Sequence, residues 1–273
     1  MKTDREAPVG VFDSGVGGLT VAREIMRNLP SEKIVYFGDT ARVPYGNKSR
    51  ETVIRYSHQI CRFLQEQQVK AIVVACNTAS AFALDAIRDD FDIPIIGVIE
   101  AGAKVAAART RNKRVGIIGT VGTVGSGIHA EYLRKLDPEI TVFGKACPLF
   151  VPLVEEGWLH DPVTVEVASR YLQELKDEQV DTLILGCTHY PLIRSTIQEV
   201  MGEKVRLVNP AYETALELKS LLTKMDILST GEQQAEFPYR FYVSDLADEF
   251  KEFANSILPY DVTMTRKIDI EKY

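Results

Sequence analysis

The chain has 273 residues, of which 45% are hydrophobic and 26% are charged, and its formal net charge is −6. This composition excludes an intrinsically disordered protein, and the length allows one large or two ordinary globular units. The acidic balance argues against general nucleic-acid binding, and no apolar run reaches the roughly 20 residues that a membrane-spanning helix needs. The first residues are charged and are not followed by the apolar stretch of a secretory signal, and the four cysteines fit a reducing compartment. We therefore expect a cytoplasmic protein.

The first third of the chain alternates apolar segments of strand length with amphipathic segments of helix length. Strands are predicted at residues 9–12 and 34–37, and a third apolar run starts at residue 71 and ends at Cys76. Helices are predicted at residues 19–28 and 52–67, and a glycine-rich turn at residues 13–18 precedes the first of them. This alternation is typical of a parallel sheet that is covered by helices on both faces.

The same pattern starts again near residue 115. Residues 115–120 resemble residues 9–14, and predicted strands at 140–143 and 183–185 correspond to those of the first half at nearly the same spacing. We therefore predict an α/β protein of two pseudo-symmetric lobes, each a mainly parallel sheet flanked by helices, with the active site in the cleft between them. Residues 1–98 plus 210–273 are expected to form the first lobe and residues 99–209 the second.

The last part of the chain continues with mixed elements. Predicted helices at 192–201, 212–224 and 245–257 alternate with predicted strands at 205–208 and 239–243. The segment after residue 210 is too short and too interrupted for an independent core, so we expect it to pack on the first lobe.

Two of the four cysteines occupy equivalent positions in the repeated pattern. Cys76 and Cys187 each follow an apolar, β-branched run, which places them at the carboxyl end of a predicted parallel strand, where open α/β sheets bind ligands. A helix that begins directly after such a cysteine is expected to lower the thiol pKa. Cys61 and Cys147 lie in apolar surroundings and are expected to be packed, inert thiols.

Other polar residues follow predicted strands as well. Asp13, Asp39 and Glu155 can serve as reagents at the same sheet edge, although aspartate is also a common helix cap. His189 either polarises the neighbouring Cys187 or is an ordinary satisfied polar residue, and the two together with Cys76 also leave a zinc site open. The glycines that follow Asp13 lack nucleotide-binding spacing and suit a backbone cradle for an anion such as a carboxylate.

Four segments, in order, resemble the signatures of the bacterial glutamate racemase family, within the aspartate/glutamate racemase superfamily: residues 13–20, 38–46, 75–79 and 186–191. The resemblance implies cofactor-independent interconversion of L- and D-glutamate for peptidoglycan synthesis, in a homodimer and without a metal. It implies that Cys76 and Cys187 are the acid/base thiols. Glu155 is chosen over Glu156 by its spacing from Cys147. The implied further catalytic residues are Asp13, Asp39, Glu155 and His189, and the implied substrate-binding residues are Asp13, Ser14, Pro44, Tyr45, Gly46, Asn77, Thr78, Thr188 and His189.

A two-lobed site with one thiol from each lobe suits this chemistry. Inverting an α-carbon requires a proton to leave one face and another proton to arrive on the opposite face, so two groups on opposite sides are needed. Three alternatives stay open from the sequence: a two-cysteine racemase of aspartate, a zinc hydrolase that uses Cys76, Cys187 and His189, and a binding role without catalysis. The last includes inhibition of DNA gyrase, with which some glutamate racemases are associated.

Overall fold

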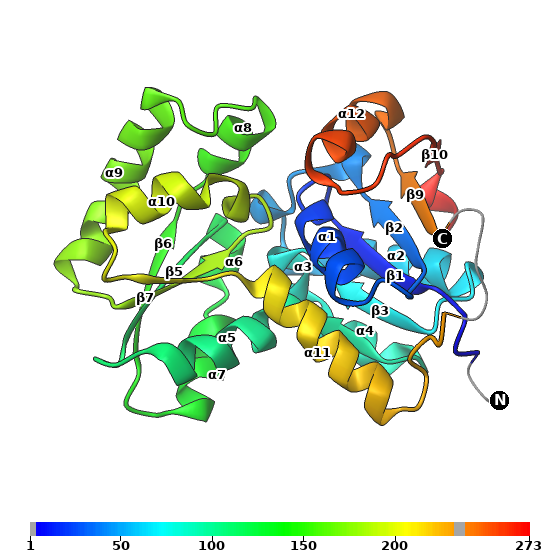
Figure 1. The fold of residues 1–273 in the computed structure, drawn as a ribbon, viewed down its shortest axis with the longest axis horizontal. Coiled ribbons are helices and arrows are strands. Elements are labelled where there is room, and N and C mark those ends of the chain that lie inside the picture. Colours follow the sequence, from blue (N-terminus) through cyan, green and yellow to red (C-terminus); the bar gives the residue numbers. More distant parts are fainter. Residues whose placement is uncertain (1–3, 232–237) are drawn as a thin grey trace.

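The computed structural model describes residues 4–231 and 238–273 as two parallel β-sheets, each flanked by helices (Figure 1). The first sheet has the strand order β10-β9-β2-β1-β3-β4, and the second has the order β6-β5-β7-β8. Every strand pair in both sheets is parallel. We call each sheet with its helices a lobe, so the predicted fold class is confirmed.

The first lobe contains the beginning and the end of the chain. Its strands are β1 (Val9–Asp13), β2 (Ile34–Gly38), β3 (Ala71–Val74), β4 (Ile95–Gly97), β9 (Tyr239–Val243) and β10 (Thr265–Lys267). Its helices are α1 (Leu19–Asn28), α2 (Arg50–Glu66), α3 (Asn77–Phe82), α4 (Leu84–Asp90), α11 (Pro210–Lys224) and α12 (Ala247–Ile257), with short 3-10 turns η1 (Thr40–Arg42), η2 (Tyr45–Asn47) and η4 (Ile270–Lys272).

The second lobe is formed by the middle of the chain. Its strands are β5 (Arg114–Gly119), β6 (Thr141–Ala146), β7 (Thr182–Gly186) and β8 (Arg206–Val208). Its helices are α5 (Val98–Arg109), α6 (Val121–Gly125), α7 (Ile128–Leu136), α8 (Phe150–Glu155), α9 (Pro162–Asp177) and α10 (Arg194–Met201), with the 3-10 turn η3 (Tyr190–Ile193).

The central strands are buried on both faces, which explains their continuous apolar sequences. Every residue of β1, β2, β3 and β7 is buried, because helices cover both faces of a parallel sheet. The segment after residue 238 extends the first sheet, since β9 pairs with β2 and β10 with β9, as predicted for the tail. Helices α5 and α11 pack against each other where the lobes meet, and α11 also packs on α1. The exact division of the chain into lobes stays a prediction.

Two predicted helices start later than their sequence pattern indicates. The helix predicted at 192–201 is wrong in its first turn: residues 190–193 form a 3-10 turn, and α10 begins only at Arg194 because Ile193 leaves the α-region with φ −104° and ψ 22°. The helix predicted from residue 245 begins at Ala247, since Leu246 is left-handed with φ 51°. Backbone dihedrals of this kind leave no mark in the apolar periodicity.

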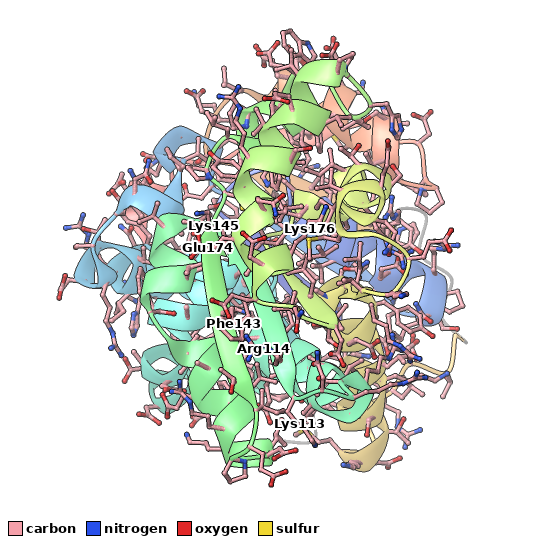
Figure 2. The ribbon with its side chains drawn as sticks, turned by 90° about the vertical axis from the view of Figure 1, so that its left-hand side faces the viewer. Lys113, Arg114, Phe143, Lys145, Glu174 and Lys176 are labelled. Atoms are coloured by element: carbon pink, nitrogen blue, oxygen red, sulfur yellow. The ribbon has the colours of Figure 1, made fainter. Side chains whose placement is uncertain are left out.

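The strand predicted at 140–143 is β6, which runs from Thr141 to Ala146. Its half-exposed second part lacks the apolar signal, because β6 is an edge strand that pairs only with β5. Figure 2 looks onto this edge and shows charged side chains along it. The Arg114 guanidinium lies 4.6 Å from the centre of the Phe143 ring, and Lys145 forms an ion pair of 2.6 Å with Glu174. Charged groups at an exposed edge oppose strand pairing with another chain.

None of the helices in residues 4–231 and 238–273 combines the length and apolarity that crossing a bilayer requires.

Candidate active site

The carboxyl ends of strands from both sheets meet at a cavity of about 340 Å³ between the lobes. The cavity brings together all but two of the residues predicted for the site, although these come from five separate segments of the chain. The predicted residues that line it are Ser14, Pro44, Tyr45, Gly46, Cys76, Asn77, Thr78, Glu155, Cys187, Thr188 and His189. Asp13 and Asp39 lie behind the wall and do not line it.

Cys76 lies between β3 and α3 and is almost completely buried. Its sulfur accepts a hydrogen bond from the backbone N–H of Ala79 at 3.5 Å, and its thiol donates to the Ser14 hydroxyl at 3.7 Å. Burial and the nearby Asp13 charge raise the pKa of Cys76 to about 12, against the lowering effect of these two contacts. The first turn of the following helix does lower this pKa through the Ala79 N–H, as expected, but desolvation and the Asp13 charge outweigh that one donor.

Cys187 has a different environment from Cys76. It follows β7 directly, but the 3-10 turn η3 takes the place of the expected α-helix. Its sulfur lies 3.8 Å from Nδ1 of His189, and Nε2 of the same imidazole lies 3.0 Å from a carboxylate oxygen of Glu155. The three side chains therefore form a chain of two contacts, from the buried sulfur through the imidazole to the half-exposed carboxylate of Glu155.

His189 is buried between two groups that can carry negative charge. Burial alone lowers the pKa of His189, but the hydrogen bonds to Cys187 and Glu155 outweigh it and raise the pKa to about 10. These contacts favour the protonated imidazole, whose positive charge would lie beside the Cys187 sulfur.

Asp13 is the last residue of β1 and is completely buried. One carboxylate oxygen accepts the Gly15 N–H at 3.0 Å, and the other has no hydrogen-bond partner among the described residues. Burial raises the pKa of Asp13, while the His189 charge and backbone N–H groups of the glycine-rich turn lower it. Gly18 is needed at this turn, because a Cβ there would lie 2.4 Å from the Cβ of Asp13.

Asp39 follows β2 and is also completely buried. Its carboxylate accepts hydrogen bonds from Arg42 Nε at 2.7 and 3.0 Å, from the Ser244 hydroxyl at 2.9 Å and from the Tyr45 hydroxyl. Both oxygens are therefore engaged by protein donors, and of these donors only Tyr45 lines the cavity.

Three threonine hydroxyls connect the lobes at the cavity. Thr78 lies 3.0 Å from Thr120 and 3.1 Å from Thr123, and the last two hydroxyls are 3.0 Å apart. Thr120 lines the cavity but is absent from the predicted site. The internal repeat could have found it, because residues 115–120 correspond to 9–14 and so place Thr120 opposite Ser14.

Apolar residues of the second lobe complete the cavity. Their sequence gives no signal for this role, because exposed valine and proline next to a helix are common. The additional apolar lining residues are Val121, Pro148, Val151 and Pro152.

The described part of the chain contains no group of three or more His, Cys, Asp or Glu side chains placed to hold a metal ion. The trio Cys76, Cys187 and His189 of the zinc alternative is thus not gathered in a ligating arrangement.

Residues 16–243 match the sequence model of the Asp/Glu/Hydantoin racemase family. A glutamate racemase from Geobacter metallireducens is 50% identical over 250 residues, which cover 92% of each chain. The chain belongs to the glutamate racemase family. The family resemblance found in the four sequence segments is thereby confirmed.

Solved structures of glutamate racemases have the same fold as this family member. A glutamate racemase isoform from Bacillus anthracis superposes with a TM-score of 0.93 at 40% identity, covering 97% of this chain and 98% of that one. The Francisella tularensis glutamate racemase in complex with D-glutamate gives a TM-score of 0.91 at 39% identity, covering 98% of this chain and 100% of that one.

Proposed function

We propose that this racemase interconverts L- and D-glutamate by two-thiol acid/base chemistry, without a cofactor, and supplies D-glutamate for peptidoglycan. The observation that carries the proposal is the cavity between the lobes, to which each sheet contributes one buried cysteine at the end of a strand. The choice of glutamate is supported by the glutamate racemase relatives and by the related structure that contains D-glutamate.

In the proposed reaction, one cysteine acts as a thiolate and the other as a thiol. The thiolate removes the proton from Cα, and the electrons of the broken C–H bond stay on the substrate as a carbanion. The thiol then donates its proton to the opposite face of the same carbon, which inverts the configuration. After turnover the protonation states of the two sulfurs have exchanged, so the enzyme is ready for the opposite enantiomer.

The surroundings of the two cysteines indicate which residues assist each of them. His189, held by Glu155, assists Cys187 with its positive charge, and Asp13 lies behind Cys76. The pKa of about 12 for Cys76 means that its ionisation needs further help. The ammonium group of a bound amino acid supplies a positive charge in this cavity, which favours a thiolate.

The two carboxylates of glutamate need hydrogen-bond donors. The cavity offers hydroxyl and amide donors from both lobes, and bonds to an ionised group are stronger than bonds between neutral groups. These donors are Ser14, Asn77, Thr78 and Thr188.

The proposal is tested by incubating the purified protein with D-glutamate in deuterated water, with no added cofactor. We expect the circular dichroism signal to decay towards that of a racemate, while proton NMR shows replacement of the Cα proton by deuterium. Absence of both changes would contradict the proposal, and a faster reaction of aspartate in the same assay would reassign the substrate.

Variants of the cysteines test the assigned roles. Cys76→Ala and Cys187→Ala should each lower kcat by roughly 100-fold or more, because each removes one acid/base group. Cys61→Ala is the matched control, since Cys61 is a buried thiol in the core of the first lobe and should leave the rate nearly unchanged. Full activity in both single variants would show that the thiols do not carry the reaction.

We further propose that the protein works in the cytoplasm as a homodimer. Sedimentation velocity tests the dimer, with a single species at twice the mass of the chain as the expected result. Cell fractionation tests the location.

A further inference from the structure

Residues Ser244 and Asp245, directly after β9, form hydrogen bonds to the turn η1. This turn precedes the cavity wall Pro44–Gly46 in the chain. Ser244 donates its backbone N–H to the Gly38 carbonyl at 3.1 Å, and its hydroxyl accepts the Ala41 N–H at 2.8 Å. The next residue, Asp245, donates its N–H to the Thr40 hydroxyl at 2.9 Å and accepts a bond from it. Residues more than 200 positions apart thus hold the turn η1 through both main-chain and side-chain bonds.

The buried carboxylate of Asp39 connects Ser244 to the cavity wall through hydrogen bonds. Ser244 and Tyr45 each donate a hydroxyl hydrogen bond to a different oxygen of Asp39. Tyr45 is 1% exposed, and it lines the cavity between Pro44 and Gly46. A fully buried carboxylate with several donors has little freedom to move. Its hydrogen bond with the Tyr45 hydroxyl therefore fixes the position of the Tyr45 side chain.

The turn η4, near the C-terminus, is connected to the Asp39 carboxylate through Arg42. The Arg42 guanidinium bonds Asp39, Gln59 at 2.5 Å and Glu271 at 3.1 Å, and it stacks 3.9 Å above the ring of Tyr56. The Tyr56 ring lies 5.7 Å from the ring of Tyr45. Glu271 of η4 thus fixes Arg42 from the protein surface.

We propose that Ser244 and Glu271 are positioning residues for glutamate binding, acting through Asp39 and Arg42 on Tyr45 and the wall Pro44–Gly46. In this arrangement Asp39 acts on the substrate by holding Tyr45 in the cavity wall through the Tyr45 hydroxyl, and it does not exchange protons with the thiols. The described C-terminal residues 238–273 contribute nothing to the cavity lining, yet in this proposal they are part of the binding apparatus. This inference rests on the proposed racemisation of glutamate.

Kinetics separate positioning from proton transfer. The wall contacts both enantiomers in the bound state, so Ser244→Ala should raise KM about five-fold for D- and for L-glutamate, equivalent to one lost hydrogen bond, with kcat within two-fold of wild type. The dissociation constant of D-glutamate, measured by calorimetry, should rise by the same factor. Ser244→Thr, which keeps a hydroxyl, should restore part of the affinity.

Ser256→Ala is the matched control, because the exposed Ser256 hydroxyl donates to the Phe253 carbonyl of its own helix α12 and, among the described residues, bonds nothing near the cavity wall. Equal KM and dissociation constants in Ser244→Ala and Ser256→Ala would overturn the proposal. A loss of kcat at unchanged KM in Ser244→Ala would also overturn it, since that result assigns Asp39 to proton transfer. A wild-type protein that neither racemises nor binds glutamate would instead contradict the proposed function.

A double-mutant cycle tests the route through Tyr45. If Ser244 acts through the Tyr45 hydroxyl, Ser244→Ala should change D-glutamate affinity less than two-fold when Tyr45→Phe is already present. Independent, additive effects of the two changes would overturn the route.

The surface variant Glu271→Gln decides the question if Ser244→Ala does not fold. Glu271 is 67% exposed, so its replacement should be tolerated, and we expect about a two-fold rise in KM. Lys272→Gln in the same turn, whose partner is Asp269, is the control and should show no rise. Identical KM values in the two variants would contradict the proposal.

Discussion

Single residues give the two cysteines different chemical environments despite their equivalent positions in the repeat. Cys76 has a serine hydroxyl and a buried carboxylate near its sulfur, whereas Cys187 has an imidazole with a raised pKa. The sequence places both cysteines at strand ends, because an apolar run that ends in Cys is visible by itself. The pKa values were not predictable in the same way, since they depend on burial and on charged groups that other elements of the fold bring close to each sulfur or imidazole.

His129 is a buried histidine outside the reaction, and it should make stability depend on pH. It lies in α7, only 2% exposed, and neither ring nitrogen has a hydrogen-bond partner among the described residues. Burial lowers the pKa of His129 from 6.5 to about 4. The unfolded chain therefore binds a proton more readily, and the free energy of unfolding should fall as the pH falls from 6.5 towards 4, by roughly 3 kcal/mol from this group.

Denaturant unfolding at several pH values between 4 and 7 measures this effect. His129→Leu should have a flatter pH dependence than wild type, because leucine has no proton to gain. His160→Ala, at an exposed position, should keep the wild-type slope. Parallel curves for wild type and His129→Leu would show that His129 does not cause the effect.

Among the elements, the glycine-rich turn before α1 and the turn after β7 lie close together across the lobes. A Cβ on Gly17 would lie 2.3 Å from the Thr188 hydroxyl and 2.5 Å from Nδ1 of His189. The Thr20 hydroxyl also donates to the Thr188 carbonyl at 2.9 Å. Glycine at position 17 is therefore required by contact with the second lobe.

Gly17→Ala should displace Thr188 and His189 together. We expect a loss of roughly 1–3 kcal/mol in the free energy of unfolding, from overpacking, and a drop in kcat/KM of about ten-fold or more. Chemical denaturation and the racemisation assay measure the two effects. Gly125→Ala is the control, because a Cβ there meets no atom within 4 Å. If Gly17→Ala changed the free energy of unfolding and kcat/KM no more than this control, the close approach at Gly17 would not matter for stability or activity.

Most buried elements could be predicted from the sequence, and the errors have local causes. The predicted strand at 34–37 agrees closely with β2, because a buried strand has a continuous apolar sequence. The predicted strand at 239–243 has the bounds of β9, which is buried from Phe241 to Val243. The prediction shortened β6, since its half-exposed residues lack that signal. It also merged η3 with α10, because a 3-10 turn followed by an α-helix has the same apolar spacing as one helix.

At the scale of the whole molecule, the site exists only where the two lobes meet. Hydroxyls of Thr78, Thr120 and Thr123 join the lobes beside the cavity, and Gly46 packs against Thr120. A ligand in this cavity contacts both lobes, so its binding energy opposes their separation.

D-Glutamate should therefore protect both lobes at once in hydrogen exchange. We expect slower exchange in residues 13–20, 44–47 and 76–80 of the first lobe and in 186–190 of the second, together with a higher Tm. Helix α7 lies outside the cavity lining and serves as the internal reference, with unchanged exchange. Protection confined to one lobe would contradict a shared binding site.

The sequence alone determined the α/β class, the repeat of two lobes, the two strand-end cysteines and the family resemblance. These features depend on local patterns: buried strands need apolar runs, and short motifs keep their residues in fixed order. Only the tertiary structure showed that Asp39 faces Tyr45, Arg42 and Ser244, that His189 lies between Cys187 and Glu155, and that Thr120 lines the cavity. Such relations join residues distant in the chain, and their energies depend on burial, which follows from the packing of the two lobes.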